Sequence, residues 1–461
     1  MAWRDRENAA RQRRLRLRSA VPAPGAAQDR SGTHARAQEP HQSSWAGARR
    51  ACGAAAAGAA CAAREALGVK LLPPLSLYIH IPWCVRKCPY CDFNSHEARA
   101  PVPEQRYIDA LIADLEAALP LVWGRKVCTV FFGGGTPSVF AADGIERIIA
   151  AVRARVPLAS DAEITLEANP GTFEAEKFRA FRAAGVNRLS IGIQSFNPRH
   201  LKALGRIHDD AQARAAVEIA RRNFDNFNLD LMYGLPQQSV DEARADIEAA
   251  LAFAPPHLSA YHLTLEPNTY FHRYPPPLPD DDTAAEMQQA VEQTLAAAGY
   301  EHYETSAFAR AGDRNACRHN LNYWMFGDYL GIGAGAHSKL SFAGRIVRQM
   351  RYKQPGQYVE CAASGSAIQE QHDVAANEVG FEFMMNALRL NQGFPAALYE
   401  ERTGMPLAAV LKELEAAERR GLIARDPLRI APTELGRRFL NDLLQLFLAE
   451  APPPGPRAAG G

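Results

Sequence analysis

Apolar segments of β type alternate with segments of helical periodicity from about residue 75 onward. The strand segments read LSLYIHI, VCTVFFGGG, AEITLEANP, RLSIGIQSF, FNLDLMYGLP and HLSAYHLTLEP. The predicted helices occupy 104–119, 143–155, 174–184, 209–222, 239–253 and 283–298. Strands and helices that alternate at this spacing form a parallel sheet with right-handed crossovers. The number of units is smaller than in a complete barrel, so the pattern predicts an α/β fold with a partial (β/α)6 barrel, although a doubly wound sheet has the same local pattern.

Polar residues late in these strands favour the barrel. Glu167, Gln194 and Asp230 each come near the end of an otherwise apolar strand, and GGG closes the second strand. The carboxyl ends of barrel strands form the active-site face. A solvated strand end is the ordinary explanation for one such residue. Several successive strands that end in this way indicate a binding face.

Changes in composition mark the predicted domain boundaries. The chain begins with an Ala/Arg-rich stretch that resembles an organellar transit peptide; a disordered basic tail and a misassigned start codon are the alternatives. After Tyr300 the repeat gives way to a Gly- and aromatic-rich segment, and the last part reads as helix, short β-wing and helix. We predict a disordered extension, the barrel, a segment that closes it, a winged-helix-like domain and a disordered tail at 1–70, 71–310, 311–373, 374–450 and 451–461.

Charge and hydropathy argue against several classes of protein. The formal net charge is +1, so the whole chain carries no electrostatic signal for nucleic acid or an anionic membrane. The winged-helix-like region has only scattered arginines, and we expect no nucleic-acid partner. No apolar run approaches the roughly 20 residues that span a bilayer. The 8 cysteines are too few for a disulfide scaffold, and their bunching indicates metal or redox chemistry in a soluble, cytoplasmic protein.

Three cysteines, Cys84, Cys88 and Cys91, form a C-x3-C-x2-C pattern directly after the first predicted strand. Structural zinc normally takes four ligands in two short-spaced pairs, and the other cysteines after residue 75 are isolated: Cys128, Cys317 and Cys361. His80 and His96 are the residues that could complete a zinc site. A [4Fe–4S] cluster held by three thiolates instead keeps one iron open for another ligand, which makes it a reaction site.

The cysteine spacing, with Tyr90 before the last cysteine, resembles the signature of the radical SAM superfamily. That resemblance implies a partial (β/α)6 barrel. It also implies that the open iron chelates the amino and carboxylate groups of S-adenosylmethionine, which one electron then cleaves to methionine and a 5′-deoxyadenosyl radical. The position of the motif after the first barrel strand is the context that the signature requires.

Further motifs resemble the oxygen-independent coproporphyrinogen III oxidase family: YIHIPWCVRKCPYCDFNSH, FFGGGTPS, LEANP, IGIQSF, LGRIH and LDLMYGLP. The likeness runs from about residue 75 to the C-terminal region. It implies that GGGTP receives the methionyl amino group, that an arginine binds a carboxylate and that an aspartate binds a ribose or an ammonium. The residues that match contacts to S-adenosylmethionine are Tyr78, Tyr90, Gly134, Gly135, Thr136, Glu167, Gln194, Arg206 and Asp230. A buried ion pair is the structural alternative for Arg206 and Asp230.

Two features depart from the oxidase pattern. The oxidases carry a further cysteine two residues after the last cluster ligand, where this chain has Phe93, and the segment that covers the oxidase site has no counterpart here. Both departures, together with RHNLNYW at 318–324, resemble the HemW subfamily of heme chaperones. This resemblance implies bound heme, a [4Fe–4S] cluster and S-adenosylmethionine. It also implies transfer of heme to an acceptor such as a respiratory enzyme, with homodimerisation and transient membrane association through the acceptor as further expectations.

Two histidines are candidates for the heme ligand. A heme site needs an axial donor and an apolar slot, and His319 and His337 both have aromatic or glycine neighbours. We predict His319, because its segment lies apart from the strand ends that bind S-adenosylmethionine, whereas His337 matches a position near that ligand in the oxidases. A satisfied polar residue is the ordinary explanation for either one.

The alternative function is a coproporphyrinogen III oxidase or another radical SAM enzyme that modifies tetrapyrroles. A nucleic-acid-binding winged helix with a degenerate barrel is a third hypothesis. The intact glycine loop and the three cysteines argue against degeneracy.

Overall fold

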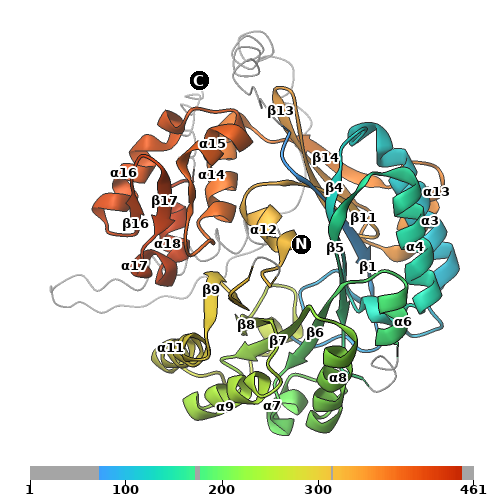
Figure 1. Ribbon diagram of the computed structural model, residues 1–461, viewed down its shortest axis with the longest axis horizontal. Coiled ribbons are helices and arrows are strands. Elements are labelled where there is room, and N and C mark those ends of the chain that lie inside the picture. Colours follow the sequence, from blue (N-terminus) through green and yellow to red (C-terminus); the bar gives the residue numbers. More distant parts are fainter. Residues whose placement is uncertain (1–71, 172–176, 313–314, 449–461) are drawn as a thin grey trace, which may run out of the picture.

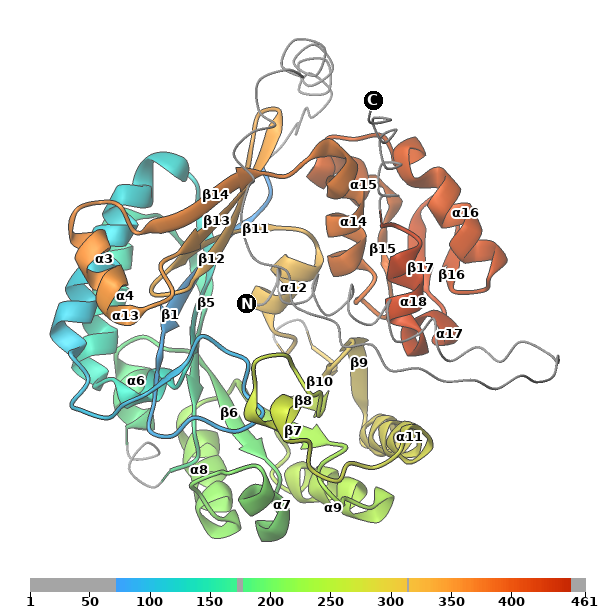
Figure 2. The same cartoon turned by 180° about the vertical axis from the view of Figure 1, so that it is seen from behind.

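The computed structural model describes residues 72–171, 177–312 and 315–448. The predicted extension 1–70 and tail 451–461 lie outside these residues. One 12-stranded sheet dominates the molecule, in the order β14-β13-β12-β11-β1-β4-β5-β6-β7-β8-β10-β9. Helices cover the outer face of this sheet, and the C-terminal helices form a separate lobe beside its open side (Figures 1 and 2).

The centre of the sheet is parallel, as the alternating pattern predicts. Its strands are β1 (Leu75–Ile81), β4 (Val127–Gly134), β5 (Leu158–Ala168), β6 (Arg188–Gln194), β7 (Phe227–Tyr233) and β8 (His257–His262). The predicted helices are α3 (Glu104–Ala118), α4 (Ala142–Arg155), α6 (Phe178–Ala183), α8 (Asp210–Asn223), α9 (Val240–Leu251) and α11 (Asp281–Ala297). The shorter elements of this part are β2 (Trp83–Cys84), β3 (His96–Glu97), α7 (Pro198–Ala203) and α10 (Tyr270–Arg273). The partial (β/α)6 barrel is therefore confirmed.

Local hydrogen bonds fix where the barrel helices begin. Asp209 and Gln212 form a capping box at the start of α8, and Ser239 and Glu242 form another at the start of α9. Each box satisfies backbone N–H groups that the first turn of a helix leaves without partners. These ends lie within a residue of their predicted positions.

Antiparallel strands extend the sheet at both edges. β11 (Asp328–Ile332) pairs in parallel with β1, and three antiparallel strands follow it. They are β12 (His337–Phe342), β13 (Arg345–Arg351) and β14 (Ile368–Asp373); β10 (Ala307–Arg310) and β9 (Tyr300–Glu304) extend the other edge. The segment predicted to close the barrel thus supplies strands that the sequence analysis did not predict, and α13 (Pro355–Ala363) packs on α3.

Helix α12 (Arg318–Trp324) lies between the sheet and the C-terminal lobe (Figure 2). It contacts β1, β4 and β11 on one side and α14 on the other. Glu163 on β5 accepts hydrogen bonds from the first two backbone N–H groups of α12, at 3.3 and 3.1 Å. A carboxylate from the barrel therefore anchors this helix at its positive end.

The C-terminal lobe has a hydrophobic core of its own, separate from the barrel core. Phe383 lies at its centre, edge-on to Phe394 and Tyr399. The lobe comprises α14 (Ala376–Ala387), α15 (Ala396–Thr403), α16 (Leu411–Arg419), α17 (Glu434–Arg438), α18 (Leu440–Gln445) and a small sheet of β15 (Phe394–Pro395), β17 (Arg429–Pro432) and β16 (Ile423–Arg425). The core of the lobe also includes Phe326 and Ile346 from the segment before residue 374, so the lobe packs on that segment. A domain boundary near residue 374 remains our proposal. Across the described residues, no helix is long and apolar enough to cross a membrane.

Candidate functional site

The three cysteines lie on and just after β2, which pairs with β3 beyond the end of β1. Cys84 is buried, and Cys88 and Cys91 are partly exposed. The Cys91 N–H donates to the Cys88 carbonyl at 3.2 Å, which folds the loop back on itself. One short loop thus presents all three sulfur atoms at the carboxyl edge of the parallel strands.

Burial changes the acidity of two of the three thiols. Burial raises the pKa of Cys84 to about 11, and the neighbouring Cys91 and Cys88 add to that rise. Burial also raises the pKa of Cys91. A metal that binds Cys84 and Cys91 must therefore displace their protons, because binding requires thiolates.

The surroundings favour a cluster over a zinc ion. His80 has both ring nitrogens engaged, Nδ1 with the Tyr78 hydroxyl at 3.0 Å and Nε2 with the Asn94 carbonyl at 2.9 Å. In the described part of the chain, no three His, Cys, Asp or Glu side chains lie close enough to share one metal ion. A cubane spreads its ligands over separate iron atoms, so three thiols on one loop suit it better than they suit zinc.

The glycine run at the end of β4 brings the cysteine loop onto the barrel. Gly134 has φ +118°, and a Cβ atom there would lie 2.5 Å from the His80 ring. A Cβ atom on Gly135 would lie 2.5 Å from the Trp83 carbonyl oxygen. The Thr136 N–H also donates to that oxygen, at 2.8 Å. The sequence analysis expected these glycines to admit a ligand. The contacts show that Gly134 leaves room for the His80 ring and that Gly135 leaves room for the backbone next to Cys84.

Two half-buried carboxyl groups lie beside the glycine run. The Gly134 N–H donates to Glu167 Oε2 at 3.2 Å, while burial and the charge of Asp230 raise the pKa of Glu167 to about 8. Asp230 accepts hydrogen bonds from Ser190 and Asn228, both at 2.8 Å, and burial raises its pKa. Neither carboxylate forms a salt bridge with a described residue. Their environment therefore suits a cationic ligand.

Arg206 reaches the cysteine loop. It donates to Asn169 Oδ1 at 2.7 Å and to Cys88 Sγ at 3.6 Å. Asn169 in turn donates to Thr136 Oγ1 at 3.0 Å. The alternative of a buried ion pair between Arg206 and Asp230 is wrong, because Arg206 points toward the thiol. Asn169 is a residue that the sequence analysis missed, although its LEANP motif contains a polar residue directly after a strand.

The remaining predicted residues frame this site. The Tyr78 ring stacks near Phe131, with 6.3 Å between centroids, and Tyr90 lies 6.4 Å from Phe271. Gln194 ends β6 with φ 69°, a left-handed conformation that is unusual for a residue other than glycine. Such strain is often held in place at binding sites.

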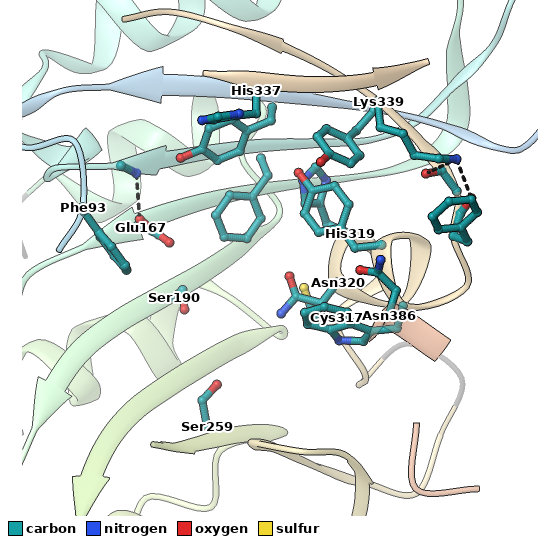
Figure 3. A pocket seen from close by; sticks show the side chains of 18 of the residues that line it. Phe93, Glu167, Ser190, Ser259, Cys317, His319, Asn320, His337, Lys339 and Asn386 are labelled. Carbon is teal, nitrogen blue, oxygen red and sulfur yellow. Dashed lines mark hydrogen bonds between the residues drawn. The ribbon is translucent and has the colours of Figure 1, made fainter. Parts of the chain in front are cut away.

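A cavity of about 340 Å³ runs from this site to the C-terminal lobe (Figure 3). The predicted site residues that line it are Tyr78, Gly134, Glu167, Asp230, His319 and His337. The predicted residues that do not line it are Tyr90, Gly135, Thr136, Gln194, Arg206, Cys84, Cys88 and Cys91. Phe93 lines the cavity, close to Glu167 in Figure 3, where the oxidases have their extra cysteine. Met385 and Asn386 of α14 bring the C-terminal lobe into the opposite wall.

The two candidate histidines share this cavity but differ in their contacts. His319 is buried, with Nδ1 at 2.7 Å from Thr129 Oγ1 and Nε2 at 2.9 Å from the Tyr323 hydroxyl. The ring of His337 is half-buried and has no hydrogen-bond partner among the described residues. His319 lies apart from the carboxyl ends of the strands, because its partner Thr129 is near the start of β4 (Val127–Gly134), but its ring is buried and held at both nitrogens.

Comparison with protein families places two parts of the chain. Residues 78–250 match the Radical SAM superfamily, and residues 374–439 match the HemN C-terminal domain. The structure of coproporphyrinogen III oxidase (HemN) from Escherichia coli superposes with a TM-score of 0.70 and 26% identity, over 83% of this chain and 92% of that one.

Proteins called heme chaperone HemW align along nearly their whole length. The protein from Escherichia coli is 49% identical over 82% of this chain and 99% of its own length. The protein from Haemophilus influenzae is 48% identical with the same coverage, and one from Mycobacterium tuberculosis is 35% identical over 81% of this chain and 95% of its own length. The chain belongs to the HemW family of heme chaperones, within the radical SAM superfamily.

Proposed function

We propose that this chain binds heme and a [4Fe–4S] cluster with S-adenosylmethionine, and that it transfers the heme to an acceptor protein. The observation that carries the proposal is the cavity that joins Glu167 and Asp230 at one end to an aromatic wall at the other. The aromatic end of such a lining fits a planar, apolar ligand, because aromatic faces cover the ring. The carboxyl end fits the cationic S-adenosylmethionine. Membership of the HemW family supports the same ligand.

The cysteine loop would hold the cluster through Cys84, Cys88 and Cys91. When bound, the cluster supplies an open iron and one electron for S-adenosylmethionine. In this proposal Glu167 and Asp230 would attract the ammonium or ribose of that ligand, and Arg206 would offer a guanidinium for its carboxylate. The remaining residues that we propose as contacts are Tyr78, Tyr90, Gly134, Gly135, Thr136 and Gln194.

Phe93 supports chaperone activity over the alternative oxidase activity. It lines the cavity with 41% of its surface exposed, and a phenyl ring there cannot donate a proton or an electron as a cysteine can. Under anaerobic conditions with a reductant and S-adenosylmethionine, the protein should not convert coproporphyrinogen III to protoporphyrinogen IX. Separation of the porphyrin products by chromatography checks this, with a bona fide oxidase as the positive control.

The acceptor belongs to the same proposal. We propose a cytoplasmic protein that delivers heme to an enzyme such as a respiratory complex, through transient membrane association with that acceptor. A homodimer is a further part of this proposal, for which sedimentation with and without the cluster is the measurement.

A heme-transfer experiment tests the function. The reconstituted protein should bind about one heme per chain and lose it to an apo heme enzyme, which gains activity in proportion. A Cys128→Ala variant is the matched control for handling, because this cysteine lies outside the cluster loop. Failure of wild-type protein to retain heme through a desalting column would refute the proposal.

A further inference from the structure

The antiparallel strands β12, β13 and β14 form one wall of the cavity. Cross-strand pairs place two rows of side chains on it, and every member of these rows lines the cavity. One row is His337, Met350 and Glu370, and the other is Lys339, Arg348 and His372. Because directly opposite residues of antiparallel strands have Cβ atoms about 5 Å apart, His337 and Met350 stand side by side.

The second row is engaged in protein contacts. Lys339 Nζ lies 3.0 Å from Asp328, and Arg348 lies 2.7 Å from Glu382. Both pairs are buried, so each cation already has a carboxylate. The third member, His372, is exposed on the edge strand. This row supports the wall and leaves the first row to face a ligand.

The cavity histidines differ in whether a ring nitrogen remains available. His257 has Nδ1 at 2.7 Å from Asn228 and Nε2 at 2.8 Å from Tyr303, and His319 is held at both nitrogens as described above. His337 alone among the buried or half-buried cavity histidines of the described chain lacks a hydrogen-bond partner. Burial also lowers the pKa of His337 to about 3, so its ring is neutral and keeps a lone pair at neutral pH.

We propose that His337, on the antiparallel wall, is the axial ligand of the heme iron, and that His319 is a wall residue held by Thr129 and Tyr323. The assignment rests on the proposed function, since it names the donor for the same heme. Met350 beside His337 supplies an apolar, polarizable surface for the porphyrin edge. Figure 3 shows His337 and His319 on different parts of the cavity wall. Ligation by His337 and ligation by His319 therefore predict different positions for the porphyrin ring.

Heme spectra of three variants test the assignment. His337→Ala should shift the heme absorption band, alter the resonance Raman lines that report iron coordination, and release heme to apomyoglobin about 10-fold faster or more. Added imidazole should restore the wild-type spectrum, because it can enter the space that the ring leaves. His319→Ala and His372→Ala should keep the wild-type coordination lines. Iron and sulfide content and circular dichroism check that each variant is folded.

The outcomes separate the ligand from the function. If wild-type protein binds no heme, the proposed function fails and the assignment fails with it. If wild-type protein binds heme but His337→Ala keeps its spectrum, only the assignment is overturned. A changed spectrum in His319→Ala or His372→Ala, with no change in His337→Ala, would move the iron to that residue.

Discussion

The carboxyl groups on two sides of the cavity differ in whether they are paired with a cation. On the parallel side, Glu167 and Asp230 lie together without a salt bridge, and the pKa of each is raised. On the antiparallel side, Asp328 contacts Arg125 at 2.8 Å and Lys339 at 3.0 Å, and the pKa of this carboxyl is lowered despite burial. A carboxyl group that lacks a cation is ready to bind one, whereas a paired carboxylate only stabilises the fold. The comparison distinguishes a ligand site from its support.

The largest expected effect is the loss of the iron–sulfur cluster when one cysteine of the loop on the parallel side is removed. Reconstituted protein should bind about four iron and four sulfide per chain, and Cys84→Ala, Cys88→Ala or Cys91→Ala should each abolish this. Iron and sulfide analysis with electron paramagnetic resonance is the measurement. The reason is that a site with two thiols no longer holds a cubane against chelation.

The control for this effect lies in the same molecule. Cys128→Ala, Cys317→Ala and Cys361→Ala should retain the cluster. Cys317 is the sharpest of these, because it lines the cavity but is buried against Glu163, at 3.8 Å. Loss of the cluster in Cys317→Ala would contradict a cluster with an open iron.

Asp328→Asn should produce the next largest effect, on the antiparallel side. The change leaves Lys339 and Arg125 without their carboxylate, and breaking a buried pair costs about 3–5 kcal/mol of unfolding free energy. Urea denaturation of the cluster-free protein measures it. Asp241→Asn is the matched control, because Asp241 forms an ion pair with Arg244 at 2.7 Å while 88% of its side chain is exposed. Equal stability of the two variants would remove the contrast between the walls.

Gly135→Ala should have an intermediate effect, on the attachment of the cysteine loop. Its new Cβ would meet the Trp83 carbonyl at 2.5 Å, and relief of such overpacking costs about 1–3 kcal/mol. The cluster should then be lost to a chelator faster than from wild-type protein. Gly356→Ala is the control, because nothing lies within 4 Å of a Cβ at that position. A wild-type rate in Gly135→Ala would mean that the loop is attached elsewhere.

Near pH 4.5, Glu167→Gln should give the smallest of these effects on stability, and this effect should change as pH rises. The unfolded carboxyl ionises near 4.5, while the folded one keeps its proton up to a pKa of about 8. The folded wild-type protein therefore loses stability as pH rises between these values, and the glutamine variant does not. Across this pH range, the melting temperature of the ligand-free variant should rise relative to that of ligand-free wild-type protein as pH increases. A constant difference between the two proteins would contradict the raised pKa of Glu167.

Much of the barrel could be predicted from the sequence. Its parallel strands are continuous apolar runs, so their burial is visible in the residues themselves, and β1 has the predicted bounds, Leu75–Ile81. The cysteine loop follows from spacing alone. Local patterns are sufficient wherever an element buries its own apolar face.

The antiparallel wall could not be predicted in this way. Its strands contain buried charged residues, and their partners are distant in sequence: Arg351 contacts Asp114, and Arg348 contacts Glu382. A sequence pattern predicts that a charged residue is exposed, unless the partner that neutralises its charge is known. The orientation of His319 was missed for the same reason, since Thr129 lies on a strand far back in the chain.

Helix α12 connects the cavity with the C-terminal lobe. Its His319 and Tyr323 line the cavity, and Trp324 lies under Arg389, 4.3 Å from the guanidinium carbon to the ring centroid. A ligand in the cavity and any protein that binds the lobe would therefore act on one short helix from two sides. Thermodynamic linkage then makes their effects reciprocal: an acceptor that weakens heme binding by a given factor is itself bound more weakly, by that factor, when heme is present. The loss of heme affinity caused by the acceptor and the loss of acceptor affinity caused by heme would both measure the same coupling free energy.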